Sequence, residues 1–291
     1  MRGVAARASL NLVAVATGKT ALLRAQRRWA DARGVRYDAH GCVRDLADNL
    51  RAPLGAATLE ELRRGSELTP YATRPARLYS LGSSAALVLN VFGHWRDRDA
   101  LPLLRALSVA GGGGVGLKFE EPLPTGLAGD APTADVMLEL DDGRYVAIES
   151  KYAEWLVRRP HGRPAFKDKY FPSSSDGGVW ADAGLPRCQA LAEDLQAGRE
   201  RPKYLHAPQL LKHALGLAKS GKRSSVLVYL YYEWPVREAA AHRSEIERVV
   251  ARLAPELGLR VLTYQALFGS LRATPGVDAQ YLEYLAQRYF A

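Results

Sequence analysis

Two acidic side chains and a lysine near the middle of this chain could do chemistry together. Glu149 and Lys151 stand at the end of the apolar segment YVAIESKY (145–152), and Asp135 stands near the start of another apolar segment. Carboxylate oxygens are hard ligands that suit Mg²⁺. A lysine beside such a metal could hold or deprotonate a water molecule. The residue types therefore indicate metal-assisted hydrolysis, if the fold brings them together.

A hairpin is predicted to position these side chains. Residues 133–140 and 144–151 read as two antiparallel strands joined by a three-residue loop that ends at Gly143. Such loops favour a glycine in the left-handed conformation at their end. The register that this loop sets also pairs Val136 with Ile148 on one continuous apolar face, and such a pattern normally fixes register.

The same register places Asp135 directly opposite Glu149, with Lys151 two residues further along on the same face. Opposed Cβ atoms in a sheet lie about 5 Å apart. Two carboxylates at that separation repel each other unless one is protonated or a cation lies between them. The alternative is a charge cluster at a solvated strand end, in which Lys151 pairs with either acid for about 1 kcal/mol or less.

Other segments predict the elements around this hairpin. Thr58 and Glu61 form a capping-box pattern, and Ser83 or Ser84 can cap the helix that follows. The long segment 157–202 shows no strong period and is predicted to be a loop or insertion. The remaining periodic or apolar segments predict helices at 20–33, 83–95 and 207–221, and strands at 115–121, 224–233 and 259–264. The central order is thus helix, three strands, helix and strand, with a crossover before the last strand.

The charge is unevenly distributed along the chain. The net charge is +9 overall, with +7 over residues 1–77, −5 over 78–157, +7 over 158–223 and zero over 224–291. A basic protein with an acidic centre suits a polyanion held around a cation site. An arginine-rich soluble protein of another kind is the equal alternative. With two cysteines and no apolar stretch of membrane-spanning length, a cytoplasmic protein without a membrane partner is expected.

Asp135 together with Glu149-Ser150-Lys151 resembles the active-site motif of the PD-(D/E)XK nuclease superfamily, the restriction-endonuclease-like fold. The chain is similar to a bacterial group of restriction-type endonucleases through GSSAALVLNVFG, the acid-X-lysine triplet and QLLKH in a later helix. The proline of the motif is displaced to Pro132. The resemblance covers roughly residues 78–233 and implies an α/β (α+β) core of order α-β-β-β-α-β with a mixed central sheet flanked by helices.

The resemblance also implies roles for individual residues. Asp135 and Glu149 would bind Mg²⁺, for which Mn²⁺ could substitute, with the backbone carbonyl of Ser150 as a further ligand. Lys151 would orient the attacking water. The second core helix often supplies a polar residue near the metal, and Gln209 is the candidate here, with Lys212 and His213 on the same helix; an ordinary polar helix face is an equal alternative.

Several members of the superfamily bring another acid from the first core helix, but this helix offers only Asn90. Glu120 or Glu121, at the end of the preceding strand, could substitute for that acid. The basic residues expected to contact the phosphates of DNA are Arg158, Arg159, Arg163, Lys167, Lys169 and Lys212.

The predicted organisation has three parts: a basic helical extension over 1–77, a nuclease core over 78–235, and a C-terminal extension of helices and a strand over 236–291. The predicted function is a Mg²⁺-dependent endodeoxyribonuclease that acts on DNA, with a homodimer left open. The alternatives are a non-catalytic nucleic-acid-binding protein on the same fold, and a hydrolase or interaction protein in which 135–151 is only structural.

Overall fold

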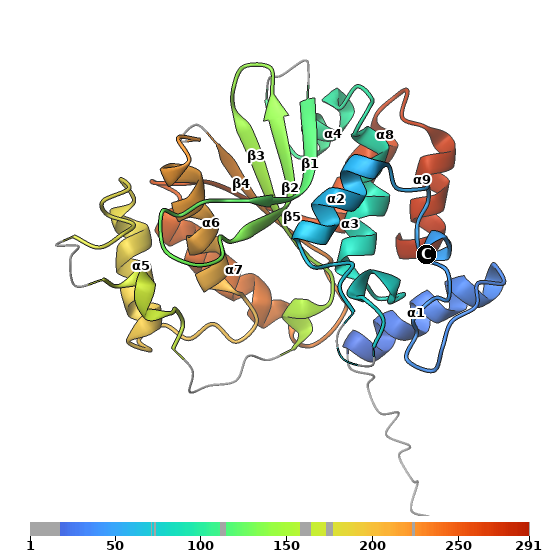
Figure 1. Cartoon of the computed structure of the whole chain (residues 1–291), viewed down its shortest axis with the longest axis horizontal. Helices are drawn as coiled ribbons and strands as arrows, with labels where there is room; N and C mark the ends of the chain where they lie inside the picture. Colours follow the sequence, from blue (N-terminus) through green and yellow to red (C-terminus); the bar gives the residue numbers. More distant parts are fainter. Residues whose placement is uncertain are drawn as a thin grey trace, which may run out of the picture.

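The computed structural model describes residues 18–70, 72, 74–110, 115–157, 164–172, 177–222 and 225–290 (Figure 1). The strands of this part are β1 (Val115–Pro122), β2 (Thr133–Leu140), β3 (Tyr145–Lys151), β4 (Val226–Tyr231) and β5 (Gly258–Thr263). The helices are α1 (Gly18–Ala32), α2 (Ala56–Arg64), α3 (Ser84–Phe92), α4 (Leu101–Ala106), α5 (Pro186–Gln196), α6 (Ala207–Lys219), α7 (Ala239–Leu253), α8 (Tyr264–Ala273) and α9 (Ala279–Leu285). A π-helical turn, Ala286–Phe290, follows α9.

The five strands form one mixed sheet in the order β1-β2-β3-β4-β5. The first three strands are antiparallel neighbours, and β4 and β5 join in parallel, each after a helical crossover. Helices cover both sides of the sheet, with α5, α6 and α7 on one side and α2, α3, α4 and α8 on the other (Figure 1). This is the mixed, helix-flanked sheet of a restriction-endonuclease-like α+β fold, and the fold prediction is confirmed.

The hairpin of β2 and β3 has the predicted register. Val136 pairs with Ile148, and Leu138 pairs with Val146. Gly143 has a φ of 78° and donates its amide to the carbonyl of Leu140, so it ends the loop in the left-handed conformation. The predicted apolar face that fixes this register is confirmed, because its four residues are fully buried: Val136, Leu138, Val146 and Ile148.

The elements on either side of the hairpin follow their sequence patterns. Ser83, rather than Ser84, caps α3 by accepting a hydrogen bond from the amide of Ala86, 3.1 Å long. The helix α6 ends as predicted, with Gly221 at a φ of 74° just beyond it. Strand β4 is buried along almost its whole length, as its continuous apolar sequence predicts for a strand covered on both faces.

Two predictions about local structure are wrong. Helix α2 begins at Ala56, so Thr58 and Glu61 lie inside it and do not form a capping box. Both side chains instead accept hydrogen bonds from the guanidinium of Arg96. The segment 157–202 is not merely a loop, because it contains the eleven-residue helix α5.

The predicted division into three parts stays a prediction. The described residues of all three contribute to one large hydrophobic cluster, and the C-terminal part supplies β5 to the common sheet. In the part of the chain that the structure describes, no helix is long and apolar enough to cross a membrane.

Candidate active site at the ends of three strands

The sheet register brings three acidic residues into one row. Val136 pairs with Ile148, so the next step of that register places Asp135 opposite Glu149. On the other side of β2, the pairs that flank Glu120 place it opposite Asp135. Glu120, Asp135 and Glu149 therefore occupy adjacent positions on β1, β2 and β3.

Two contacts hold Asp135, Glu149 and Lys151 at this end of the sheet. The backbone amide of Ser150 donates a hydrogen bond of 2.6 Å to Asp135 Oδ2. The ammonium of Lys151 forms an ion pair with Glu149 Oε1, where the Glu149 side chain is 1% exposed and the Lys151 side chain 12%. The structure thus brings the predicted trio together in a nearly buried position, which excludes the solvated strand end considered above.

The carboxyl groups in this row hold their protons more tightly than usual. Burial, and then the charge of Glu149, raises the pKa of Asp135 from 3.8 to about 8. Burial, and then the charges of Asp135 and Glu67, raises the pKa of Glu120 from 4.5 to about 9. Burial also raises the pKa of Glu149. Burial is the largest cause of each shift, and neighbouring acids raise the pKa values of Asp135 and Glu120 further.

One lysine faces several acids at this end of the sheet. Burial lowers the pKa of Lys151, but the carboxylates of Glu149, Asp135 and Glu154 outweigh burial and raise it above its ordinary value. Lys151 is therefore firmly protonated. Two more acids border the row: Glu67, whose pKa is raised chiefly by burial, and Glu154, which accepts hydrogen bonds from the amides of residues 152 and 153.

Glu120 has an unusual backbone. Its φ is 48°, in the left-handed region that non-glycine residues rarely occupy. Gly65 makes room for its side chain, because a Cβ at Gly65 would stand 2.3 Å from Glu120 Oε2. Of the two acids considered for this strand end, Glu120 is the one beside Asp135, since Glu121 pairs with Ala134 and points to the opposite face of the sheet.

The second core helix, α6, places His213 beside the acidic row. The sequence predicted Gln209 for this position and offered His213 only as a residue on the same helix. His213 Nδ1 lies 3.4 Å from Glu149 Oε2, and the imidazole is completely buried. Burial, and then the charge of Lys151, lowers the pKa of His213 to about 3, so the ring is neutral. The predicted residue, Gln209, lies one turn earlier on α6, and its amide oxygen is paired with His206 Nδ1 at 2.9 Å. The rotation of α6 about its own axis therefore places His213, and not Gln209, beside Glu149.

The donor set fits a hard divalent cation. Both carboxylate oxygens of Glu149 are buried and receive no well-directed hydrogen bond from the described residues. Among those residues, no three His, Cys, Asp or Glu side chains converge on a single point. Asp135 and Glu149 would therefore need backbone carbonyl and water oxygens to complete a shell, which is how Mg²⁺ usually binds to proteins. Ser150, whose carbonyl is the predicted further ligand, is buried, and its hydroxyl is hydrogen-bonded to Tyr264 at 2.7 Å.

The structure describes only some of the basic residues that are predicted to contact the phosphates of DNA. Arg158, Arg159 and Arg163 lie outside the described residues. Lys167 is exposed, whereas the ammonium of Lys169 donates to the backbone carbonyl of Ala128, 2.5 Å away. Lys212 is half-buried on α6, close enough for its charge to lower the pKa of Glu149 in opposition to burial.

Asn90 is not part of this site. Its side-chain oxygen accepts the amide of Arg51 at 2.6 Å, and its amide group donates to the hydroxyl of Tyr289 at 2.8 Å. It is a buried connector between segments distant in sequence.

Comparison with known proteins supports the assignment of a restriction-endonuclease-like fold. No curated protein and no solved structure matches the chain. One family model matches residues 49–290, and its description is restriction endonuclease associating with ARP. The match includes all five strands and the acidic row, and it covers most of the chain. The chain therefore belongs to this restriction endonuclease family.

Proposed function

We propose that the chain is a Mg²⁺-dependent endodeoxyribonuclease of the PD-(D/E)XK type. The observation that carries the proposal is the pair of opposed carboxylates, half-buried Asp135 and buried Glu149, with Lys151 beside them. A purely structural site would not gain from burying several acids around one ammonium, because each uncompensated charge costs free energy. A divalent cation compensates that charge.

In this proposal Asp135 and Glu149 hold the cation, with the Ser150 carbonyl as a further ligand. The bound Mg²⁺ would activate a water molecule and neutralise charge that develops on the scissile phosphate. Lys151 is protonated, so its ammonium orients that water and stabilises negative charge in the transition state. The neutral ring of His213 packs beside Glu149, with Nδ1 3.4 Å from Oε2, and adds no competing positive charge.

We propose DNA as the substrate, in line with the restriction endonuclease family. The net charge of +9 and the exposed Lys167 support contacts with phosphates. Affinity should then fall steeply with added salt, since each neutralised phosphate releases about one counterion. The family description also names an association with ARP. We propose by the same membership that the chain associates with ARP, and a homodimer is the alternative assembly.

The decisive experiment is a plasmid-nicking assay of the wild type and Asp135→Asn, with Mg²⁺, with Mn²⁺ and with EDTA. The wild type should nick DNA with either metal and not in EDTA, and Asp135→Asn should be inactive under all conditions. Asp142→Asn is the matched control, because Asp142 lies at the exposed hairpin turn and pairs only with Arg144 among the described residues.

The same assay, combined with DNA-binding measurements, separates the alternatives. A wild type that binds DNA but leaves the plasmid intact with both metals would favour the non-catalytic nucleic-acid-binding protein. A wild type that neither binds nor cuts DNA would leave the site as a structural charge cluster.

A further inference from the structure

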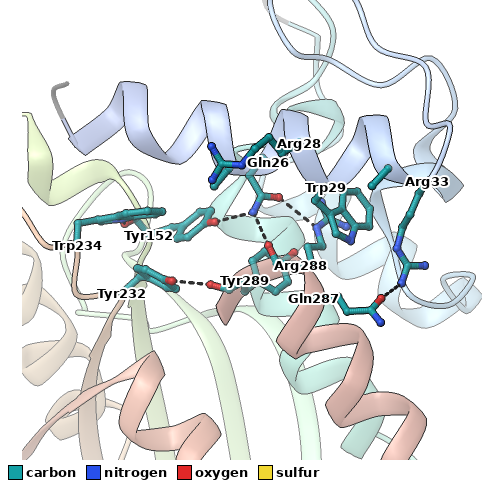
Figure 2. A pocket seen from close by; sticks show the side chains of 12 residues that line it. Gln26, Arg28, Trp29, Arg33, Tyr152, Tyr232, Trp234, Gln287, Arg288 and Tyr289 are labelled. Carbon is teal, nitrogen blue, oxygen red and sulfur yellow. Dashed lines mark hydrogen bonds between the residues drawn. The ribbon is translucent and has the colours of Figure 1, made fainter. Parts of the chain in front are cut away.

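A pocket lies apart from the acidic row, between α1, the segments that follow β3 and β4, and the C-terminal π-helical turn (Figure 2). Its volume is 590 Å³, within the range of about 300–1,000 Å³ typical of small-molecule sites. None of the residues of the proposed metal site lines it.

The charge of this pocket is uniformly positive. Of its twelve lining residues, three are arginines and none is acidic. Arg28 and Arg33 are exposed, whereas Arg288 is only 3% exposed. Every acceptor that the Arg288 guanidinium reaches in the described structure is neutral: Gln26, Asn49 and Tyr284.

A buried guanidinium without a carboxylate partner is costly unless an anion comes to it. Arg288 uses four of its N–H groups in these hydrogen bonds, and a guanidinium has five. The pocket therefore has a positive electrostatic potential that attracts an anionic group. Arg288 also has one N–H group that these four hydrogen bonds do not use.

The walls of the pocket are aromatic. The guanidinium of Arg288 stacks over Trp29 at 4.1 Å, and Tyr152, Tyr232 and Trp234 form a cluster of rings opposite α1 (Figure 2). Trp29 is 7% exposed, and its indole N–H is buried without a hydrogen-bond partner among the described residues. Aromatic and guanidinium faces bind nucleobases by stacking, at about 1–3 kcal/mol per base.

We propose that this pocket binds one nucleotide unit, with its phosphate held by the arginines and its base against the aromatic side chains. Two sources have this chemistry: a free nucleotide that acts as an effector, and a nucleotide of the DNA substrate that leaves the base stack. A mononucleotide suits the volume of the pocket.

The pocket shares backbone with the proposed catalytic lysine. The amide of Tyr232 donates to the carbonyl of Lys151 at 2.8 Å, and Trp234 Nε1 donates to the carbonyl of Tyr152 at 2.9 Å. A ligand that moves these rings acts on the peptide directly after Lys151.

Isothermal titration calorimetry with 5′-deoxynucleoside monophosphates tests the free-nucleotide source. The titrations are done in EDTA, so that the result does not depend on the proposed nuclease activity. Saturable binding is expected, with at least tenfold weaker binding of the nucleoside and of inorganic phosphate. Arg28→Glu and Arg33→Glu should each weaken binding at least tenfold and should not unfold the protein, because both side chains are exposed. Arg24→Glu, an exposed residue of α1 outside the pocket, is the matched control and should bind normally.

Duplexes that carry 2-aminopurine at successive positions test the DNA source, again in EDTA. A nucleotide of the substrate in the pocket would give a rise in fluorescence at one position, and Arg28→Glu should abolish that rise while Arg24→Glu preserves it. This arm rests on the proposed DNA substrate, whereas the mononucleotide arm does not. The proposal is overturned if neither arm detects binding, or if Arg24→Glu weakens binding as much as the two pocket variants do.

Discussion

Glu120 lies opposite Asp135 across β1 and β2, although the backbone of Glu120 is in the left-handed region with a φ of 48°. This conformation costs about 1–2 kcal/mol for a residue other than glycine. The protein therefore tolerates both backbone strain and carboxylate repulsion at the same position. Strain of this kind tends to persist at functional sites, where the surrounding structure holds it in place.

Glu120→Gly should stabilise the metal-free protein by about 0.5–1 kcal/mol, because relief of the left-handed strain exceeds the entropic cost that glycine adds. It should also weaken Mg²⁺ binding if Glu120 contributes to the site. Urea denaturation without metal and Mg²⁺ titration by calorimetry measure the two effects. Glu121→Gly is the matched control and should destabilise by about 0.5–1 kcal/mol, as glycine does within an ordinary strand. Destabilisation by both variants would contradict the strain argument.

The metal-free protein should lose stability as the pH rises from 7 to 9. Asp135 and Glu120 have folded-state pKa values of about 8 and about 9, above their ordinary values of 3.8 and 4.5. The folded state therefore binds more protons than the unfolded state in this window, and stability falls with pH. The low pKa of His213 acts in the opposite direction, but only below about pH 6.5.

Mg²⁺ should reverse this loss, because the cation replaces the protons of the carboxyl groups. The increase in melting temperature on addition of Mg²⁺ should be larger at pH 9 than at pH 7. Melting curves at both pH values, with Mg²⁺ and with EDTA, measure this. A melting temperature that is independent of pH without metal would show that the acids are not protonated in the folded state.

Lys151→Met should destabilise the metal-free protein by about 3 kcal/mol, since it leaves Glu149 buried without its ion-pair partner. It should also abolish cleavage while preserving most DNA binding. Lys151→Arg should recover much of the stability, because it keeps the positive charge, yet should remain nearly inactive because the larger guanidinium cannot occupy the position of the ammonium. Denaturation, DNA-binding and nicking assays separate the structural role from the catalytic one. Full activity in Lys151→Met would remove this residue from the mechanism.

His213→Leu should weaken Mg²⁺ binding about tenfold, the lower end of the effect of losing a residue that supports a metal ligand. The reason is that the fully buried imidazole packs with Nδ1 3.4 Å from Glu149 Oε2 and limits the space in which that carboxylate can move. His213→Gln should recover part of the affinity, since its amide can donate a hydrogen bond. His242→Leu is the control, because His242 is equally buried but is paired with Tyr229 at 3.0 Å. It should lower stability without changing Mg²⁺ affinity.

The hairpin that positions the site could be predicted because two independent signals agree. The glycine at 143 sets the loop, and the apolar alternation of Val136 and Ile148 sets the register. The placement of Asp135 opposite Glu149 then follows from strand geometry alone. The left-handed conformation of Glu120 has no such signal, because it depends on space left by Gly65, which is distant in sequence.

Helix contacts were harder to predict than strand contacts. The choice of His213 over Gln209 depends on how α6 is rotated against the sheet, which the sequence of the helix does not specify. The capping-box prediction failed for a related reason: Arg96 is a distant partner that competes for both Thr58 and Glu61. Local rules predict local hydrogen bonds only when no tertiary partner offers better ones.

The contact between Gln26 and Arg288 joins segments that are 262 residues apart, and it closes the nucleotide pocket beside the peptide of Lys151. During synthesis on the ribosome, the strands that carry the acidic row emerge well before the residues around 288. A nascent chain can thus form the hairpin that carries Lys151 before the residues around 288, which complete the pocket, have been synthesised. The protein gains its complete site only after nearly the whole matched segment has left the ribosome, which would delay the proposed nuclease activity until the chain can fold as one unit.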